Sequence, residues 1–169
     1  MKVIIITNIP SPYRVLQFDR LKEILVDELI VFYNHKIESN RKWDIPELKH
    51  PAYFCRQSFF SRFQFYPDLL KQLKKEKPDI IIAAGFTITV IFAFLYAKIV
   101  KKKFIVFTDS WLHSVNQLTF LHKIIRKFII KRADASVCVG KKGKDYLSFF
   151  GSKSDSIFIS PLAINNLHY

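Results

Sequence analysis

One stretch of the chain, residues 77–111, restricts its fold more than any other. It reads KPDIIIAAGFTITVIFAFLYAKIVKKKFIVFTDSW, with two short apolar runs, 79–84 and 104–108, on either side of a segment long enough for a helix. Both runs are rich in β-branched and aromatic residues, which favour extended backbone. Two strands joined by a crossover helix lie parallel, and strands that are apolar at consecutive positions are covered on both faces. The stretch therefore predicts a parallel sheet between two layers of helices.

The same stretch has a competing interpretation as a transmembrane helix. Residues 80–97 contain no charged residue, and about 18 apolar residues are enough to cross a bilayer. However, Gly85, Thr87 and Thr89 interrupt the run, and basic residues flank it on both sides, which gives no preferred orientation. We therefore favour the interpretation as strand, helix and strand.

The rest of the chain repeats this alternation of strands and helices. Further strands are predicted at residues 3–9, 28–33, 135–139 and 157–160. Helices are predicted at residues 12–25, 67–76, 87–100, 118–131 and 142–150, and a polar connection at residues 109–117. About six strands alternating with about five helices indicate an α/β domain with a doubly wound, mostly parallel sheet and helices on both faces. A chain of 169 residues buries one substantial core, which predicts a single domain.

The predicted helix at residues 118–131 is amphipathic. We expect its apolar stripe to face the core, with Leu121, Ile124, Ile125, Phe128 and Ile129 inside. The opposite face is basic and carries His122, Lys123, Arg126, Lys127, Lys131 and Arg132. Such a face is more often solvated than bound to a partner, and contact with a membrane is the alternative.

Residues 34–66 show no sustained period and contain two prolines, which predicts a long functional or mobile loop. Within it, residues 54–66 read FCRQSFFSRFQFY. The interleaved arginines and phenylalanines would suit stacking on nucleic-acid bases, insertion into an anionic membrane surface, or simple packing beneath the loop. The packing interpretation is at least as common as the other two. The residues of the candidate membrane surface are Arg56, Phe59, Phe60, Arg62 and Phe63.

The composition indicates an affinity for phosphate groups. The chain carries 27 Lys and Arg against 14 Asp and Glu, a formal net charge of +13. Such a surplus attracts nucleic acids, anionic lipids or phosphorylated small molecules, and charge alone does not choose among them. The two cysteines, Cys55 and Cys138, fit neither a disulfide framework nor a zinc site, so we expect no metal. The apolar run at residues 3–6 is too short for a signal peptide, so we expect a cytoplasmic location.

Candidate site residues follow the predicted strands, because ligands of open parallel sheets bind at the carboxyl ends of the strands. These positions are residues 7–14, 85–87, 109–113 and 140–143. The sequence has no G-x-G-x-x-G fingerprint, and GKKGK at 140–144 lacks the spacing of a phosphate-binding P-loop. Asp109 and His113 are the candidate acid/base residues, and the alternative is a capping Asp beside a surface His.

Five segments, in order, are KVIIITNIPSPYR, PDIIIAAG, KKFIVFTDSW, RKFIIKRADASVCVGKKGKDYL and ISPLAINN. Together with the order of the elements, they resemble the N-terminal domain of GT-B glycosyltransferases of family four. The resemblance covers nearly the whole chain. It implies a Rossmann-like domain at residues 1–164 and the start of an interdomain linker at 165–169, with the C-terminal donor domain absent.

The resemblance also implies a function. In such enzymes this domain holds the acceptor, and a second domain holds the nucleotide sugar, linked to UDP or GDP, and the paired-glutamate motif. This domain would then need no cofactor of its own and would be inactive alone. The residues that would line the acceptor side of the cleft are Pro10, Ser11, Pro12, Tyr13, Arg14, Gly85, Phe86, Thr87, Ser110 and Trp111. Ile9-Pro10-Ser11-Pro12 stands in place of the family's glycine-rich first loop.

The partners implied by the resemblance are a sugar or lipid-linked acceptor, the missing donor domain or subunit, and an anionic membrane surface at the cytoplasmic leaflet. Two other classes of function stay open. One is a nucleic-acid-binding domain that uses the Arg and Phe cluster, which we favour less. The other is a non-catalytic subunit that docks on the membrane and recruits a catalytic partner.

Overall fold

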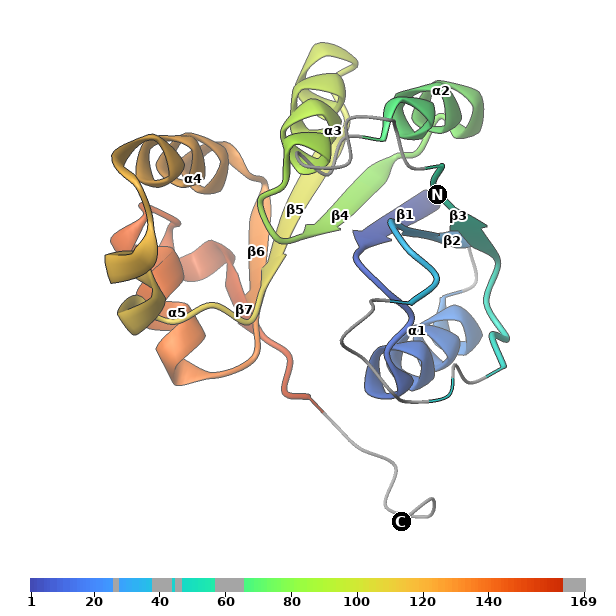
Figure 1. Ribbon diagram of the computed structural model, residues 1–169, viewed down its shortest axis with the longest axis horizontal. Helices are drawn as coiled ribbons and strands as arrows, with labels where there is room; N and C mark the ends of the chain where they lie inside the picture. Colours follow the sequence, from blue (N-terminus) through green and yellow to red (C-terminus); the bar gives the residue numbers. More distant parts are fainter. Residues whose placement is uncertain (26–27, 38–43, 45–46, 57–65, 163–169) are drawn as a thin grey trace.

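The structure is a computed structural model that describes residues 1–25, 28–37, 44, 47–56 and 66–162 (Figure 1). The strands are β1 (Lys2–Thr7), β2 (Glu28–Tyr33), β3 (Ala52–Phe54), β4 (Ile80–Ala84), β5 (Lys103–Thr108), β6 (Ala135–Cys138) and β7 (Ile157–Ile159). The helices are α1 (Pro12–Ile24), α2 (Pro67–Glu76), α3 (Ile88–Ile99), α4 (Phe120–Arg132) and α5 (Lys141–Phe149), with short 3-10 helices η2 (Leu112–Gln117) and η3 (Ser154–Ser156).

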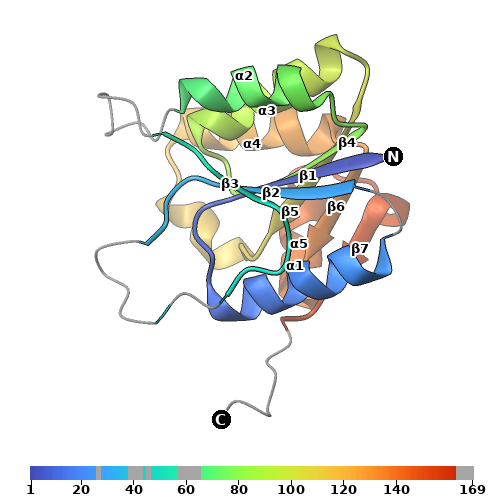
Figure 2. The ribbon, with the colours of Figure 1, turned by 90° about the vertical axis from the view of Figure 1, so that its right-hand side faces the viewer.

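The strands form one seven-stranded sheet in the order β3-β2-β1-β4-β5-β6-β7, and every pair is parallel. Helices α2, α3, α4 and α5 pack into a shared core on one face, and α1 packs on the other (Figures 1 and 2). This confirms the predicted Rossmann-like, doubly wound α/β fold, with seven strands instead of about six. The strand order reverses between β1 and β4, and in open α/β sheets such a reversal opens a crevice for ligands.

Strand β1 explains why the central strands are apolar at consecutive positions. Ile4 and Ile6 belong to the core beneath α2, α3, α4 and α5. Val3 and Ile5 point to the opposite face and pack with Phe18 of α1. Successive side chains of a strand alternate between the two faces, so a strand with a core on each side needs an unbroken apolar run.

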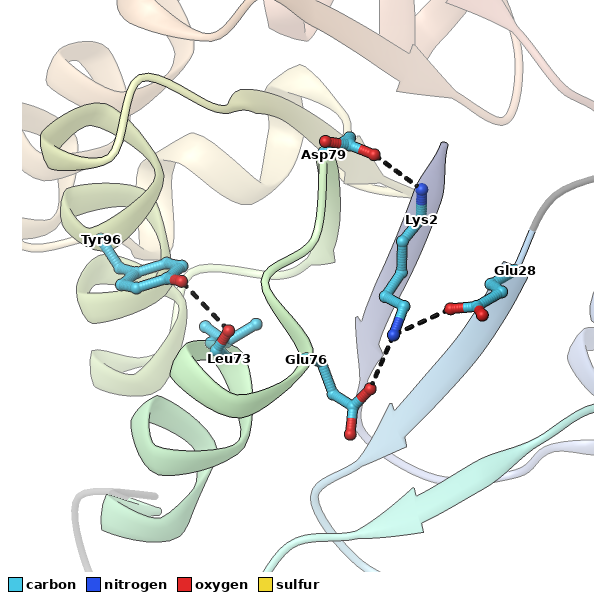
Figure 3. A network of polar contacts seen from close by, with 6 residues as sticks. All are labelled: Lys2, Glu28, Leu73, Glu76, Asp79 and Tyr96. Carbon is cyan, nitrogen blue, oxygen red and sulfur yellow. Dashed lines mark hydrogen bonds and ion pairs between the residues drawn. The ribbon is translucent and has the colours of Figure 1, made fainter.

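The amino ends of the strands are joined by ion pairs around Lys2 (Figure 3). The Nζ atom of Lys2 lies 2.8 Å from Glu28 Oε2 and 3.0 Å from Glu76 Oε2. Its backbone N–H donates to Asp79 Oδ2 at 2.9 Å. These contacts connect β1 to β2, to the end of α2 and to the residue before β4. They lie at the edge of the sheet opposite the carboxyl ends, where the site is expected.

The segment expected to be a loop contains a strand. Ala52–Phe54 forms β3 and pairs with residues 31–33 of β2 at the edge of the sheet. A strand of three residues is too short to show the alternation on which sequence analysis depends. In the same way, residues 112–117, which we expected to form part of a polar connection, are wound into η2.

The transmembrane interpretation of residues 80–97 is not supported. This stretch divides into the strand β4, a turn at Gly85 with φ of 81°, and the 12-residue helix α3. In the part of the chain that the structure describes, no helix combines the length and the apolar character needed to cross a bilayer.

Helix α4 is oriented differently from the expectation. Ile129 and Ile130 are buried, but Leu121, Ile124 and Phe128, which we expected inside, are 63%, 48% and 43% exposed. The apolar side chains of this helix cover more of its surface than the core can bury. Ile129 and Ile130 therefore join the core beneath α2, α3, α4 and α5, and the partly buried Ile125 packs against it.

Candidate functional site

A cavity of about 250 Å³ lies at the point where the strand order reverses. It is lined by residues from segments 7–14, 84–87 and 107–109, which follow or end β1, β4 and β5. Of the sequence-predicted residues, the cavity brings together Ser11, Tyr13, Arg14, Gly85, Thr87 and Asp109. The parallel register places these three strand ends side by side, which is why residues about 100 positions apart meet here.

Arg14 is the charged group buried in this cavity. It is 8% exposed, and its guanidinium carbon lies 4.0 Å from the centre of the Phe107 ring. Its Nη1 donates to Gln17 Oε1 at 3.3 Å. Burial lowers the pKa of Arg14, and the nearby Tyr13 and Asp109 partly oppose this effect. Because no described residue forms a salt bridge with it, and because a guanidinium has five N–H donors, Arg14 can still bind an anionic or hydroxyl-rich ligand.

The two candidate acid/base residues do not share one site. Asp109 directly follows β5, lines the cavity and is exposed. His113 lies within η2, where its ring is 5.2 Å from the ring of Trp111, and it does not line the cavity. No hydrogen bond between the two is present in the described structure. The structure therefore places Asp109, and not His113, where a ligand would bind.

A second groove, of about 750 Å³, adjoins the cavity between α3 and α4. The predicted residues Phe86 and Ser110 line this groove, and Thr87 lines both the groove and the cavity. Thr108 Oγ1 accepts a hydrogen bond from the N–H of Ser110 at 3.1 Å, which fixes the turn after β5. Trp111 lines neither space, and its ring is 5.0 Å from the Nζ of Lys142.

Two helices begin at the cavity, each after a short turn. Thr87 caps α3, since its hydroxyl accepts a hydrogen bond from the N–H of Val90 at 3.4 Å. Ser11 begins α1 but makes no side-chain cap bond, and Pro12 occupies the first turn. The N–H groups at the start of a helix attract anions, so the first turn of α1 adds to the positive potential of Arg14. Pro10 and Pro12 shape this turn and do not line the cavity.

Sequence analysis missed Arg126 as a site residue and assigned it to a solvated face. Its guanidinium carbon lies 4.7 Å from the centre of the Phe86 ring, and its Nη1 donates to the hydroxyl of Tyr146 at 2.5 Å. It lines the groove between α3 and α4. No local pattern marks this position, because Phe86 and Tyr146 come from distant parts of the sequence.

Asn8 and Asn34 were also missed. Asn8 lines the cavity, and its Oδ1 accepts a hydrogen bond from Asn34 Nδ2 at 3.1 Å. Asn34 is buried after β2, and its own Oδ1 has no hydrogen-bond partner within the described structure. Asn8 falls within the segment after the first strand that the sequence marked, so its position was available from the pattern.

Most of the candidate membrane surface falls on residues that are not described. Phe59, Phe60, Arg62 and Phe63 lie outside the described residues. Arg56 is exposed, and its backbone N–H donates to Asp68 Oδ2 at 2.8 Å. The described residues contain no group of three or more His, Cys, Asp or Glu side chains placed to hold a metal ion.

Comparison with known proteins identifies the family. Residues 27–165 match the profile of Glycosyltransferase Family 4, and the chain belongs to this family. The resemblance seen in the sequence is thereby confirmed. No curated protein matches the chain significantly.

Solved structures share the fold. The crystal structure of Anabaena Alr3699/HepE in complex with UDP and glucose matches with a TM-score of 0.70 and 14% identity, over 98% of this chain and 45% of that one. The UDP-GlcNAc 2-epimerase of Methanocaldococcus jannaschii matches with a TM-score of 0.59 and 20% identity, over 94% of this chain and 45% of that one. The chain thus spans less than half the length of these proteins. At such identities the likeness establishes the fold alone.

Proposed function

We propose that this chain is the acceptor-binding half of a glycosyltransferase that moves a sugar from a nucleotide sugar to a glycan or lipid-linked acceptor. Membership of the glycosyltransferase family supports sugar transfer in general. The observation that supports acceptor binding is the cavity between the ends of β1 and β4, where the strand order reverses. The buried Arg14 and the exposed Asp109 both line this cavity.

The chemistry of the cavity suits a sugar with an anionic neighbour. Hydroxyl and amide groups of Thr7, Asn8, Ser11, Thr87 and Thr108 surround it and can bind sugar hydroxyls. Arg14 would hold a phosphate, a carboxylate or a pair of hydroxyls on the acceptor. Asp109 is a carboxylate that can accept the proton of the attacking hydroxyl. His113 lies beside Trp111, so in this proposal the acid/base role rests on Asp109.

The donor half belongs to a second domain or subunit in this proposal. Solved structures of the same fold are more than twice as long as the portion that matches, and HepE was crystallised in complex with UDP and glucose. A UDP- or GDP-linked sugar would bind on that second half and meet the acceptor above the carboxyl ends of β1 and β4. Lipid-carried acceptors would place the enzyme at the cytoplasmic membrane surface.

Ligand-observed NMR on the purified chain tests the proposal. A panel of glycans and polyprenyl-diphosphate sugars is compared with UDP, GDP and their sugars. Acceptors are expected to give binding signals that Arg14→Gln weakens by about tenfold or more, because charge-assisted hydrogen bonds are lost. Arg20→Gln, on the exposed side of the same helix, is the matched control and should leave binding unchanged.

A transfer assay with radiolabelled nucleotide sugars completes the test. The chain alone is expected to transfer no sugar to any acceptor in the panel. Transfer by this polypeptide without another would show that the division between acceptor and donor halves is wrong. Binding of nucleotide sugars at the Arg14 cavity, with no acceptor bound, would show that the cavity serves the donor.

A further inference from the structure

Helices α3 and α4 expose a group of large apolar side chains on one face of the molecule. On α4, Leu121 is 63% exposed, Ile124 48% and Phe128 43%. On α3, Phe92, Leu95 and Ile99 are exposed as well. The two helices lie on the same side of the sheet (Figures 1 and 2). Phe94 of α3 touches Phe128 of α4, with ring centres 5.8 Å apart. We call these six exposed residues the α3–α4 face.

The charged side chains that α3 and α4 themselves carry are all positive. Helix α4 reads FLHKIIRKFIIKR and contains no acidic residue, and neither does α3. Lys127, Lys131 and Arg132 are exposed, and Lys123 is half-buried. The guanidinium carbon of Arg132 lies 4.2 Å from the centre of the Phe128 ring, so a cation lies directly against an exposed apolar group. Apolar and cationic side chains therefore lie next to one another on the exposed side of α4.

We infer that the α3–α4 face docks in the plane of an anionic lipid bilayer. A helix with apolar side chains on one side and Lys or Arg around them lies at the boundary of head groups and acyl chains. The ammonium groups of long lysines reach the phosphates while their stems stay apolar. A second copy of this chain is disfavoured as the occupant, because two surfaces of the same sign repel, and the chain carries a net charge of +13.

The α3–α4 face also lies beside the candidate site. The groove of about 750 Å³ is lined by Leu121 and Arg126 of α4 and also by Thr87 and Ser110. Thr87 also lines the cavity that holds Arg14. On a docked domain, this groove would lead a lipid-carried acceptor from the bilayer to the cavity. This last step rests on the proposed function, whereas the docking itself does not.

Co-sedimentation with vesicles tests the inference. Phosphatidylcholine vesicles are compared with vesicles that contain added phosphatidylglycerol, at low and high salt. Binding of the wild-type chain is expected to rise with the anionic lipid and to fall with salt. The triple variant Lys123→Glu, Lys127→Glu, Lys131→Glu should bind at least about tenfold more weakly. The double variant Leu121→Gln, Ile124→Gln should also lose binding, since exposed apolar anchors are removed.

A matched control distinguishes the effect of where the charges lie from the effect of the total charge of the protein. Lys49, Lys141 and Lys153 are exposed and lie outside α3 and α4, and reversing all three changes the net charge by the same amount. This control should bind within about twofold of the wild type, because only the charges near the lipid surface contribute strongly. Circular dichroism and urea denaturation check that each variant is folded.

Three outcomes would overturn the inference. One is a control that loses as much binding as the α4 variants, which would indicate non-specific attraction. Another is loss of binding in Arg56→Glu, Arg62→Glu with full binding in the α4 variants, which would place the contact on the other candidate surface. The third is binding to single-stranded RNA but not to vesicles. Acceptor binding measured in parallel should persist in the triple lysine variant, whose residues line neither the cavity nor the groove, so failure of docking and failure of the proposed function are distinguishable.

Discussion

The guanidinium carbon of Arg14, in the first turn of α1, lies 4.0 Å from the centre of the Phe107 ring at the end of β5. This stacking joins two elements across the reversal in strand order. Phe107 is 5% exposed, so the arginine rests on a buried apolar surface. A cation in such a place costs free energy of desolvation, which the lowered pKa of Arg14 reflects. A cost of this kind is typical of binding sites, where stability is exchanged for function.

Replacing Arg14 with an apolar residue of similar length tests this view. Arg14→Met keeps the contact with Phe107 and removes the buried charge, so the free energy of unfolding should stay the same or rise by about 1 kcal/mol. Urea denaturation measures this change, and Arg20→Met on the same helix is the control. A loss of more than about 1 kcal/mol in Arg14→Met alone would mean that the arginine serves the fold.

Buried His50 connects the segment before β3 to α1 and β2. Its Nδ1 lies 2.6 Å from Asp19 Oδ1, and its Nε2 lies 2.9 Å from the hydroxyl of Tyr33. His50→Ala would leave both buried groups without these partners, so the free energy of unfolding should fall by about 2–4 kcal/mol. His50→Phe preserves the ring and should recover only part of this loss. The exposed His122→Ala is the control, and a loss in His50→Ala as small as in that control would contradict the prediction.

Gly143 allows α5 to approach β6. A Cβ atom at this position would lie 2.7 Å from the Cβ of Cys138 and 3.7 Å from the carbonyl oxygen of Ser110. Gly143→Ala should therefore lower the free energy of unfolding by about 1–3 kcal/mol, because the helix must move away from the sheet. Gly140→Ala is the matched control, since an added Cβ there meets nothing within 4 Å. Equal midpoints of urea denaturation for the two variants would show that α5 adapts without strain.

Sequence analysis located the central strands because their signals are local. The apolar runs at 79–84 and 104–108 correspond to β4 and β5 within one residue at each end, since Pro78, Gly85 and the flanking lysines mark their limits. The short edge strand β3 was missed, because its pairing with β2 is visible only in three dimensions. The carboxyl ends of the strands could also be placed, and this is how Arg14 and Asp109 were found.

The orientation of helices and loops could not be predicted from the sequence. The apolar pattern of α4 shows that it is amphipathic. Which of its apolar side chains are buried depends on how the helix packs against the sheet. Leu121 and Phe128 were therefore placed inside by mistake. The position of His113 in η2, outside the cavity that Asp109 lines, depends on the same packing. Whether these residues and the rest of the predicted acceptor site act on a sugar stays a prediction.

Asp134 should make stability depend on pH in acid. Burial of its carboxyl group opposes ionisation, but hydrogen bonds from Lys98, from the backbone N–H of Phe104 and from Lys103 outweigh this and lower the pKa to about 2. The distances are 2.7 Å to Lys98 Nζ, 3.0 Å to Lys103 Nζ and 3.0 Å to the Phe104 nitrogen. Because the pKa is lower in the folded state than the value of about 3.9 in an unfolded chain, the ionised group stabilises the fold above about pH 4.

The lowered pKa of Asp134 predicts how the stability of the Asp134→Asn variant depends on pH. At pH 7 the variant should lose about 1 kcal/mol of unfolding free energy, since solvent screens the partly exposed ion pairs. The difference from the wild type should shrink as the pH falls from about 4 towards 2, where the folded carboxyl itself becomes protonated. Urea denaturation at a series of pH values measures this difference, with the exposed Asp155→Asn as the control. A difference that stays constant from pH 7 to pH 3 would mean that Asp134 acts through neutral hydrogen bonds, because only an ionising group loses its contribution over that interval.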